Sequence, residues 1–205
     1  MIDTHAHITD KSFDADRPDA IRRACDAGVE AVVEICDDAA RWASSLGFVS
    51  GHAGVFASIG FHPHNAKDYF EKGNDVEFER LACGDQEACR IVAVGEVGLD
   101  YYRNNSPPEI QRKAFSKQLD IWRRSSKPLI VHSRDAANDT AAMLREHVPN
   151  NIKNAGIIHC FTLDAEAAFR YIELGFLIGI GGAVTFPVSY THLRAHETVL
   201  DLVCR

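Results

Sequence analysis

Residues 2–7 read Ile2-Asp3-Thr4-His5-Ala6-His7, a strand-like run that ends in two histidines. A doubly wound, nucleotide-binding sheet would place a glycine-rich phosphate loop directly after its first strand. Histidines take that place here, which favours the rival architecture, a parallel barrel whose chemistry lies at the carboxyl ends of its strands. Residues two apart on an extended segment point to the same side, so both imidazoles can reach one metal ion.

The same alternation of strand and helix continues along the chain. Short, nearly continuous apolar runs predict parallel strands covered on both faces. These runs are Ile2–His5, Ala31–Ile35, Val55–Ile59, Ile91–Val94, Leu129–His132, Gly156–His159 and Phe176–Ile180. The patterns between them predict helices, several of which start at Asp or Pro and stop at Gly. These patterns are Pro18–Ala27, Asp38–Gly51, Asp75–Ala88, Pro108–Ser125, Ala136–Glu146 and Asp164–Leu174.

These elements predict an α/β fold, a TIM-type (β/α)₈ barrel that is incomplete, with about seven strands and the eighth strand missing. The 205 residues suffice for one such domain, and the composition, 46% hydrophobic and 25% charged, is ordinary for a globular protein. The net charge of −7 excludes a broad basic surface for non-specific nucleic-acid binding. It leaves open a nucleic acid held at a local cationic site, because a bound metal adds positive charge.

Cysteine usage and the apolar runs predict the compartment. The six cysteines form no Cys-x-x-Cys pair, so we expect reduced thiols rather than a zinc ribbon or a redox motif. The first residues lack a basic region followed by an apolar run, and no apolar run is long enough to span a membrane. We therefore expect a cytoplasmic protein that needs neither a membrane nor an obligate protein partner.

Ligand-type side chains stand at the ends of further predicted strands. Glu96, His132 and His159 each follow or end an apolar run, as His5 and His7 do. Imidazole and carboxylate together suit zinc, manganese or a similar ion, and a bridging carboxylate suits two ions. Each residue alone also fits a capped or hydrogen-bonded role, but buried His and Glu are costly without partners. The joint pattern therefore predicts a hydrolytic metal site, where bound water ionises at a pH of about 7.

Other polar residues near these strand ends are candidates for catalysis and substrate binding. His62 and His64 flank Pro63 and either donate to a phosphate or belong to a proline-fixed turn. Arg134 can contact a phosphate or pair with a carboxylate such as Asp135. Tyr101 and its neighbour Tyr102 can stack on a base or pack at the rim, and rim packing is favoured for Tyr102.

The chain resembles the TatD family of metal-dependent deoxyribonucleases, which are amidohydrolase-like TIM barrels. The motifs that carry the resemblance are Ile2-Asp3-Thr4-His5-Ala6-His7, Gly60-Phe61-His62-Pro63-His64, Val94-Gly95-Glu96-Val97-Gly98-Leu99-Asp100-Tyr101-Tyr102, Gln111-Arg112-Lys113-Ala114-Phe115, Val131-His132-Ser133-Arg134-Asp135-Ala136, Ile158-His159-Cys160-Phe161 and Gly179-Ile180-Gly181-Gly182. They occur in family order over about the first nine-tenths of the chain.

The resemblance implies a ligand set and an activity. It implies that His5 and His7 bind one divalent ion, that Glu96 bridges two ions, and that His132 and His159 complete the second site. The two ions would be zinc, manganese or magnesium. The family's activity is metal-dependent hydrolysis of DNA, so the implied partner is a DNA substrate.

The last residues depart from the family pattern. We expect a hydrolase domain over 1–187 and an unrelated tail over 188–205, helical or disordered, which replaces the family's last strand and its catalytic Asp. Asp201 does not stand in the family motif, and His192, His196 and Glu197 imitate a metal site only at helical spacing. The expected consequence is an open barrel with impaired activity.

Fold and ligands do not choose a substrate, so two alternatives to a deoxyribonuclease stay open. One is a hydrolase of another ester or amide that uses the same metal site. The other is an inactive fragment that binds a metal or a nucleic acid, which the departure from the family's catalytic Asp favours.

Overall fold

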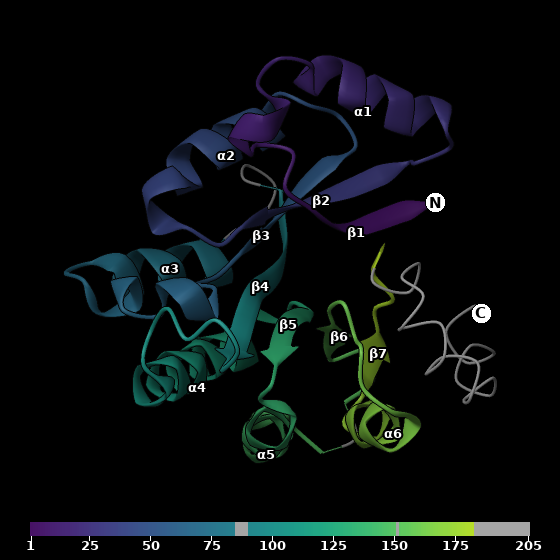
Figure 1. Ribbon diagram of the computed structural model, residues 1–205. Helices are drawn as coiled ribbons and strands as arrows, with labels where there is room; N and C mark the ends of the chain where they lie inside the picture. Colours follow the sequence, from purple (N-terminus) through teal and green to yellow (C-terminus); the bar gives the residue numbers. More distant parts are fainter. Residues whose placement is uncertain (85–89, 151, 183–205) are drawn as a thin grey trace.

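Seven parallel strands form one sheet, in which each strand pairs with its neighbours in sequence, from β1 to β7 (Figure 1). The computed structural model describes residues 1–84, 90–150 and 152–182. The strands are β1 (Ile2–Ala6), β2 (Ala31–Cys36), β3 (Val55–Ile59), β4 (Ile91–Asp100), β5 (Leu129–Arg134), β6 (Gly156–Ile158) and β7 (Phe176–Ile178). This order, with helices between consecutive strands, is that of a parallel barrel and confirms the predicted fold class.

Helices follow the strands and lie outside the sheet (Figure 1). They are α1 (Arg17–Asp26), α2 (Trp42–Ser50), α3 (Asn74–Cys83), α4 (Pro108–Ser125), α5 (Ala137–His147) and α6 (Ala165–Glu173), with short 3₁₀ turns η1 (Lys11–Phe13), η2 (Ala39–Arg41), η3 (Pro63–Asn65) and η4 (Asp68–Phe70). The pattern expected over 38–51 is thus divided between η2 and α2. The pattern expected over 75–88 ends, within the described residues, at Cys83.

Two apolar layers hold the strands in place. The larger layer lies between helices and sheet, where Phe78, Phe115 and Leu144 are fully buried against strand residues such as Ile59 and Leu129. A smaller cluster of Val33, Ile35, Ala93 and Ile130 forms a separate group. Burial of the apolar side chains in both clusters stabilises the sheet through the hydrophobic effect. The polar side chains at the strand ends lie outside these clusters.

The sheet curves until its first and sixth strands approach each other. The ring of His5, on β1, stacks on the ring of His159, just after β6, with centroids 3.4 Å apart. Residues of β1, β6 and β7 line a common cavity of about 800 Å³. β1 is largely exposed, with Ile2 at 63%, so the expectation that every strand is covered on both faces is wrong for β1, which is an edge strand of the described sheet.

Strands β4 and β5 are longer than the apolar runs predict. β4 continues through Gly95 to Asp100, and β5 continues to Arg134. The polar ends stay extended because the two strands pair along them, with Gly98 opposite His132. Gly98 has φ +144°, and a Cβ there would lie 2.0 Å from the carbonyl oxygen of His132, so only glycine permits this approach.

Several expectations concern residues outside the described ranges. The tail at 188–205, with His192, His196, Glu197 and Asp201, belongs to them. Among the helices of the described part, none combines the length and the apolar character that crossing a bilayer requires.

Candidate metal centre

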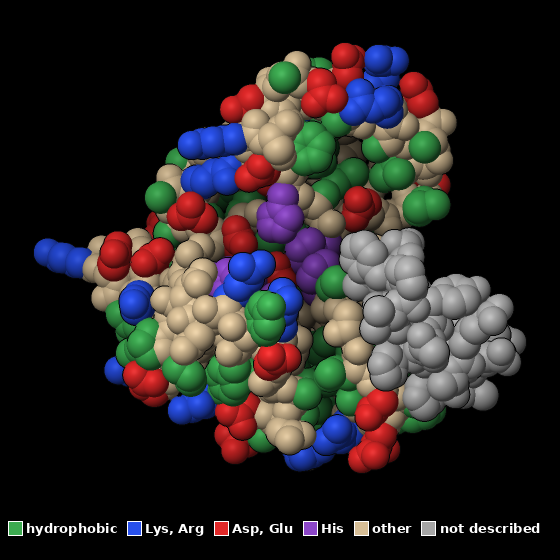
Figure 2. Space-filling model, in the orientation of Figure 1, with side chains coloured by type: hydrophobic (Ala, Val, Ile, Leu, Met, Phe, Trp, Pro, Cys, Tyr) green, Lys and Arg blue, Asp and Glu red, His purple; other side chains and the backbone are tan. Residues whose placement is uncertain are grey.

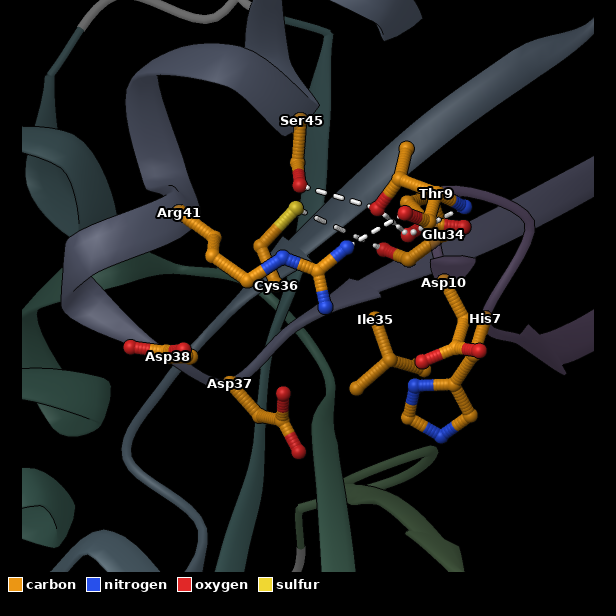
Figure 3. A pocket seen from close by; sticks show the side chains of 10 residues that line it. All are labelled: His7, Thr9, Asp10, Glu34, Ile35, Cys36, Asp37, Asp38, Arg41 and Ser45. Carbon is orange, nitrogen blue, oxygen red and sulfur yellow. Dashed lines mark hydrogen bonds between the residues drawn. The ribbon is translucent and has the colours of Figure 1, made fainter. Parts of the chain in front are cut away.

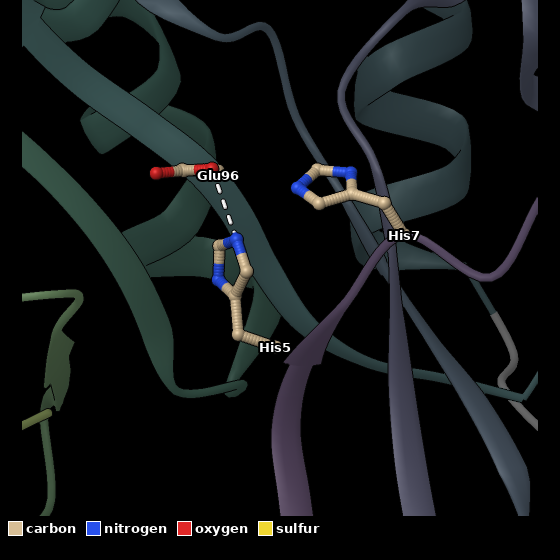
Figure 4. A group of neighbouring side chains, drawn as sticks. All are labelled: His5, His7 and Glu96. Carbon is tan, nitrogen blue, oxygen red and sulfur yellow. Dashed lines mark ion pairs between the residues drawn. The ribbon is translucent and has the colours of Figure 1, made fainter. Parts of the chain in front are cut away.

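Glu96 is the centre of the polar cluster at the carboxyl ends of the strands (Figure 4). It lies in β4 and is 4% exposed. Its Oε2 atom is 3.3 Å from Nε2 of His5, and its Oε1 atom is 2.9 Å from Nδ1 of His132. The two oxygens of one carboxylate therefore face two different histidines, which is the arrangement a bridging ligand requires.

The described residues contain two groups that fit a metal ion, and Glu96 belongs to both. In one group the ligand atoms of His5, His7 and Glu96 lie within 4.8 Å of one another, and in the other those of His62, Glu96 and His132 do. The two groups bring together side chains from β1, β4 and β5 and from the segments that follow β1 and β3. His159 lies against His5 by ring stacking rather than in either group.

The donor chemistry of these groups fits divalent metals. Imidazole nitrogens and carboxylate oxygens are ligands of zinc and manganese. Nδ1 of His5 is buried without a hydrogen-bond partner among the described residues. No hydrogen bond at Nδ1 therefore turns the ring away from Glu96, which Nε2 of His5 faces. Figure 2 shows the histidine side chains gathered in a hollow near the middle of the face in view.

The backbone after His7 is fixed by a buried carboxylate (Figure 3). Glu34, in β2, accepts hydrogen bonds from the backbone N–H of Ile8 at 2.6 Å and of Thr9 at 3.2 Å, and from the Thr9 hydroxyl at 2.5 Å. Arg17 donates to the carbonyl of Ile8, and Arg41 donates to that of Thr9. The peptide groups next to the His-x-His pair are thus satisfied by side chains from three other segments.

The loop that carries His62 and His64 is held by α4. Gln118 is 1% exposed and accepts from the backbone N–H of Phe61 at 2.8 Å while its amide donates to the Phe61 carbonyl at 3.2 Å. Nδ1 of His62 accepts from the backbone N–H of His64 at 3.1 Å. In a neutral ring this places the proton of His62 on Nε2, so the ring offers an N–H donor and no free lone pair for a metal ion, which leaves Glu96 and His132 as the ligands of the second group.

Burial and neighbouring charges shift several pKa values. Burial favours a raised pKa for Glu96, but hydrogen bonds from His132 and His5 outweigh it and hold the pKa well below its usual value. For His132, burial favours a lower pKa and the bond to Glu96 reverses the direction, so the pKa is raised. Burial lowers the pKa of His62 to about 3 and that of His159 to about 4. Glu96 is therefore ionised and the rings of His62 and His159 are neutral near pH 7.

Arg134 and the two tyrosines lie beyond Asp100 and His132 at the rim. The guanidinium of Arg134 lies 4.1 Å from the ring centroid of Tyr102, which is 60% exposed. The hydroxyl of Tyr101 donates to Asp139 at 2.7 Å, so this hydrogen bond holds the ring against the first turn of α5. Tyr102 is therefore the more accessible aromatic ring of the pair, although its sequence position favours rim packing.

Three carboxylates of this region were given no role by sequence reasoning. They are Glu34, Asp37 and Asp100, of which Asp37 lines the same small cavity as His7 (Figure 3). Burial raises the pKa of Asp37, which the charge of His7 opposes. A signal was present in each case, because each acidic residue stands inside or directly after a buried apolar run.

Comparisons with known proteins show which family this chain resembles. The sequence model of the family described as "TatD related DNase" matches residues 2–200. The chain is 33% identical over 186 residues to the uncharacterized metal-dependent hydrolase YabD of Bacillus subtilis, covering 91% of the chain and 70% of YabD. It is 35% identical over 199 residues to the uncharacterized metal-dependent hydrolase TatD of Mycobacterium tuberculosis, covering 92% and 71%. The crystal structure of YjjV, a TatD homologue from Escherichia coli, superposes with a TM-score of 0.81 at 28% identity over 92% of the chain and 70% of YjjV.

Proposed function

This chain belongs to the TatD family of metal-dependent hydrolases, and from that premise we propose that it is a deoxyribonuclease that cleaves phosphodiester bonds with two divalent metal ions, zinc, manganese or magnesium. The observation that carries the proposal is the position of the Glu96 carboxylate, which directs one oxygen toward His5 and the other toward His132. His5, His7 and Glu96 would hold one ion, and Glu96, His132 and His159 the other. Bound divalent ions supply hydroxide at neutral pH and stabilise charge on the phosphate.

The remaining side chains act on the substrate in this proposal. His62 is a neutral ring with its proton on Nε2, so it donates a hydrogen bond to a phosphate or leaving-group oxygen without changing its own charge. His64 lies beside it, with ring centroids 4.3 Å apart, and is a second contact for the substrate. Together these rings form a pair of substrate contacts in the loop after β3.

A DNA substrate is supported by the rim. Arg134 supplies a fixed positive charge, and its stacking on Tyr102 leaves much of that tyrosine exposed. Arg103 also lies over Tyr102, at 5.9 Å from the ring centroid. Aromatic rings bind unpaired bases by stacking, and guanidinium groups bind phosphates in a fork. Tyr101 would contribute through Asp139 and the wall of the adjoining cavity rather than by stacking.

The test compares DNA with other hydrolysable bonds. Wild-type protein and the Glu96→Ala variant are incubated with manganese, magnesium or zinc and a labelled single- or double-stranded oligonucleotide. Parallel reactions contain p-nitrophenyl acetate and an amide substrate. We expect metal-dependent cleavage of the oligonucleotide that is lost in Glu96→Ala.

Each other outcome points to a stated alternative. Hydrolysis of the ester or amide without cleavage of DNA would indicate a hydrolase with a different substrate. Metal binding without turnover of any substrate would indicate a binding fragment and would refute the deoxyribonuclease proposal.

A further inference from the structure

Asp100 is the last residue of β4 and lies four residues after Glu96, with 1% of its surface exposed. Its Oδ2 atom is 3.1 Å from Nε2 of His132 and 2.9 Å from Nε2 of His64. One carboxylate oxygen therefore contacts two imidazole rings of the site. We propose that Asp100 is the positioning residue of the centre, which fixes the nitrogen that each of these two rings presents to its ligand.

Hydrogen bonds hold both the backbone and the carboxylate of Asp100, so its side chain can orient the rings of His132 and His64. Its other oxygen, Oδ1, accepts from the backbone N–H of Arg103 at 2.8 Å. The buried side chain of Gln111 accepts from the backbone N–H of Asp100 at 2.8 Å and donates to its carbonyl at 2.9 Å. The same amide also donates to the carbonyl of Ser106 at 2.7 Å. Backbone and carboxylate are thus both fixed before any ligand binds, which is the condition for a preorganised site.

The consequence for His132 is a choice between its two ring nitrogens. A carboxylate accepts and does not donate, so Nε2 of His132 must carry a proton to bind Asp100. Nδ1 lies 2.9 Å from Oε1 of Glu96 and donates to that carboxylate in the metal-free protein, so a metal ion bound between Nδ1 and Glu96 would take the place of this proton. Asp100 therefore makes Nδ1 the ligand atom, and it places that atom beside the carboxylate that both metal groups share.

The same reasoning extends to His64. Its Nε2 also carries a proton toward Asp100, so the neutral ring offers Nδ1 as an acceptor. His62 offers the opposite group, an N–H at Nε2, because its Nδ1 accepts from the backbone of His64. The two histidines of the His-Pro-His loop thus present one donor and one acceptor to the substrate, and Asp100 sets the second.

The proposal rests on the proposed metal centre but is tested without any hydrolysis, so the two can fail separately. Metal-free wild type, Asp100→Asn and Asp120→Asn are titrated with cobalt(II) by calorimetry and visible absorption. Asp120→Asn is the matched control, because Asp120 lies 3.8 Å from the imidazole of His147 in the helical layer. In Asp100→Asn an amide N–H facing His132 would place the ring proton on Nδ1, where it blocks the ligand atom.

We expect Asp100→Asn to bind one of the two cobalt ions about 10- to 100-fold more weakly and to change the visible absorption of that ion. The affinity of Asp100→Asn for the other ion, and both affinities of the control variant, should equal those of the wild type. Equal affinities in wild type and Asp100→Asn would overturn the proposal. If Asp100→Asn does not fold, ¹⁵N NMR of the zinc-loaded wild type decides the question. A metal-bound Nδ1 and protonated Nε2 in His132 support the proposal, and the reverse assignment refutes it.

Discussion

Replacing Glu34 with alanine should destabilise the protein and loosen the His-x-His segment together. The change removes the acceptor of the backbone N–H groups of Ile8 and Thr9, while the Thr9 hydroxyl keeps its contact with Ser45 at 2.9 Å. Each buried donor left without a partner costs about 1–3 kcal/mol. For the buried donor of Ile8 and the half-buried donor of Thr9 we expect a total loss of about 3 kcal/mol in the free energy of unfolding.

Urea denaturation of the metal-free protein measures this loss as a lower midpoint at unchanged slope. The control is Glu30→Ala, which removes a carboxylate that is 83% exposed and pairs with the amino terminus, and should cost less than about 1 kcal/mol. Affinity for the first metal ion should also fall in Glu34→Ala, because Ile8 and Thr9 directly follow His7. Equal midpoints for the two variants would refute the reasoning that Glu34 anchors this segment.

Three further predictions concern packing, protonation and metal binding. Gly98→Ala should cost at least about 3 kcal/mol in a urea melt, because its Cβ would overlap the His132 carbonyl, whereas Gly47→Ala, with open space in α2, should be neutral or stabilising. The metal-free protein should lose stability as the pH falls from 6.5 toward 4, because the folded state binds protons at His62 and His159 less tightly than the unfolded chain. For His62 the slope is at most about 1.4 kcal/mol per pH unit, and His62→Gln should flatten the curve. Manganese or zinc at about 100 times its dissociation constant should add about 2.7 kcal/mol of stability, measured as a raised melting temperature that a chelator reverses.

The order of strands and helices could be predicted from the sequence because each apolar run is local and has the length of one element. The limits of β4 could not. The segment from Gly95 to Asp100 contains two glycines and two acidic residues, which locally indicate a loop. It is a strand because it pairs with β5, and that pairing depends on a close approach between Gly98 and His132 that no local pattern encodes.

The ligand-type residues at the strand ends could also be predicted, since parallel strands bring their carboxyl ends to one edge. Their grouping could not be predicted. The stacking of His159 on His5 and the approach of His62 to Glu96 and His132 depend on the curvature of the sheet. The role of Asp100 was missed for a similar reason, because its partner His64 is 36 residues away in sequence.

The two buried glutamines of α4 have a consequence for how this chain tolerates change. Gln111 and Gln118 stand seven residues apart on one helix, and each grips both polar groups of a single peptide residue, Asp100 and Phe61 respectively. The helix lies outside the sheet and fixes the distance between the end of β4, at Asp100, and the segment after β3, at Phe61. Substitution of either glutamine would therefore release one of these two segments from the helix without removing the apolar side chains, such as Phe115, that pack the helix against the sheet.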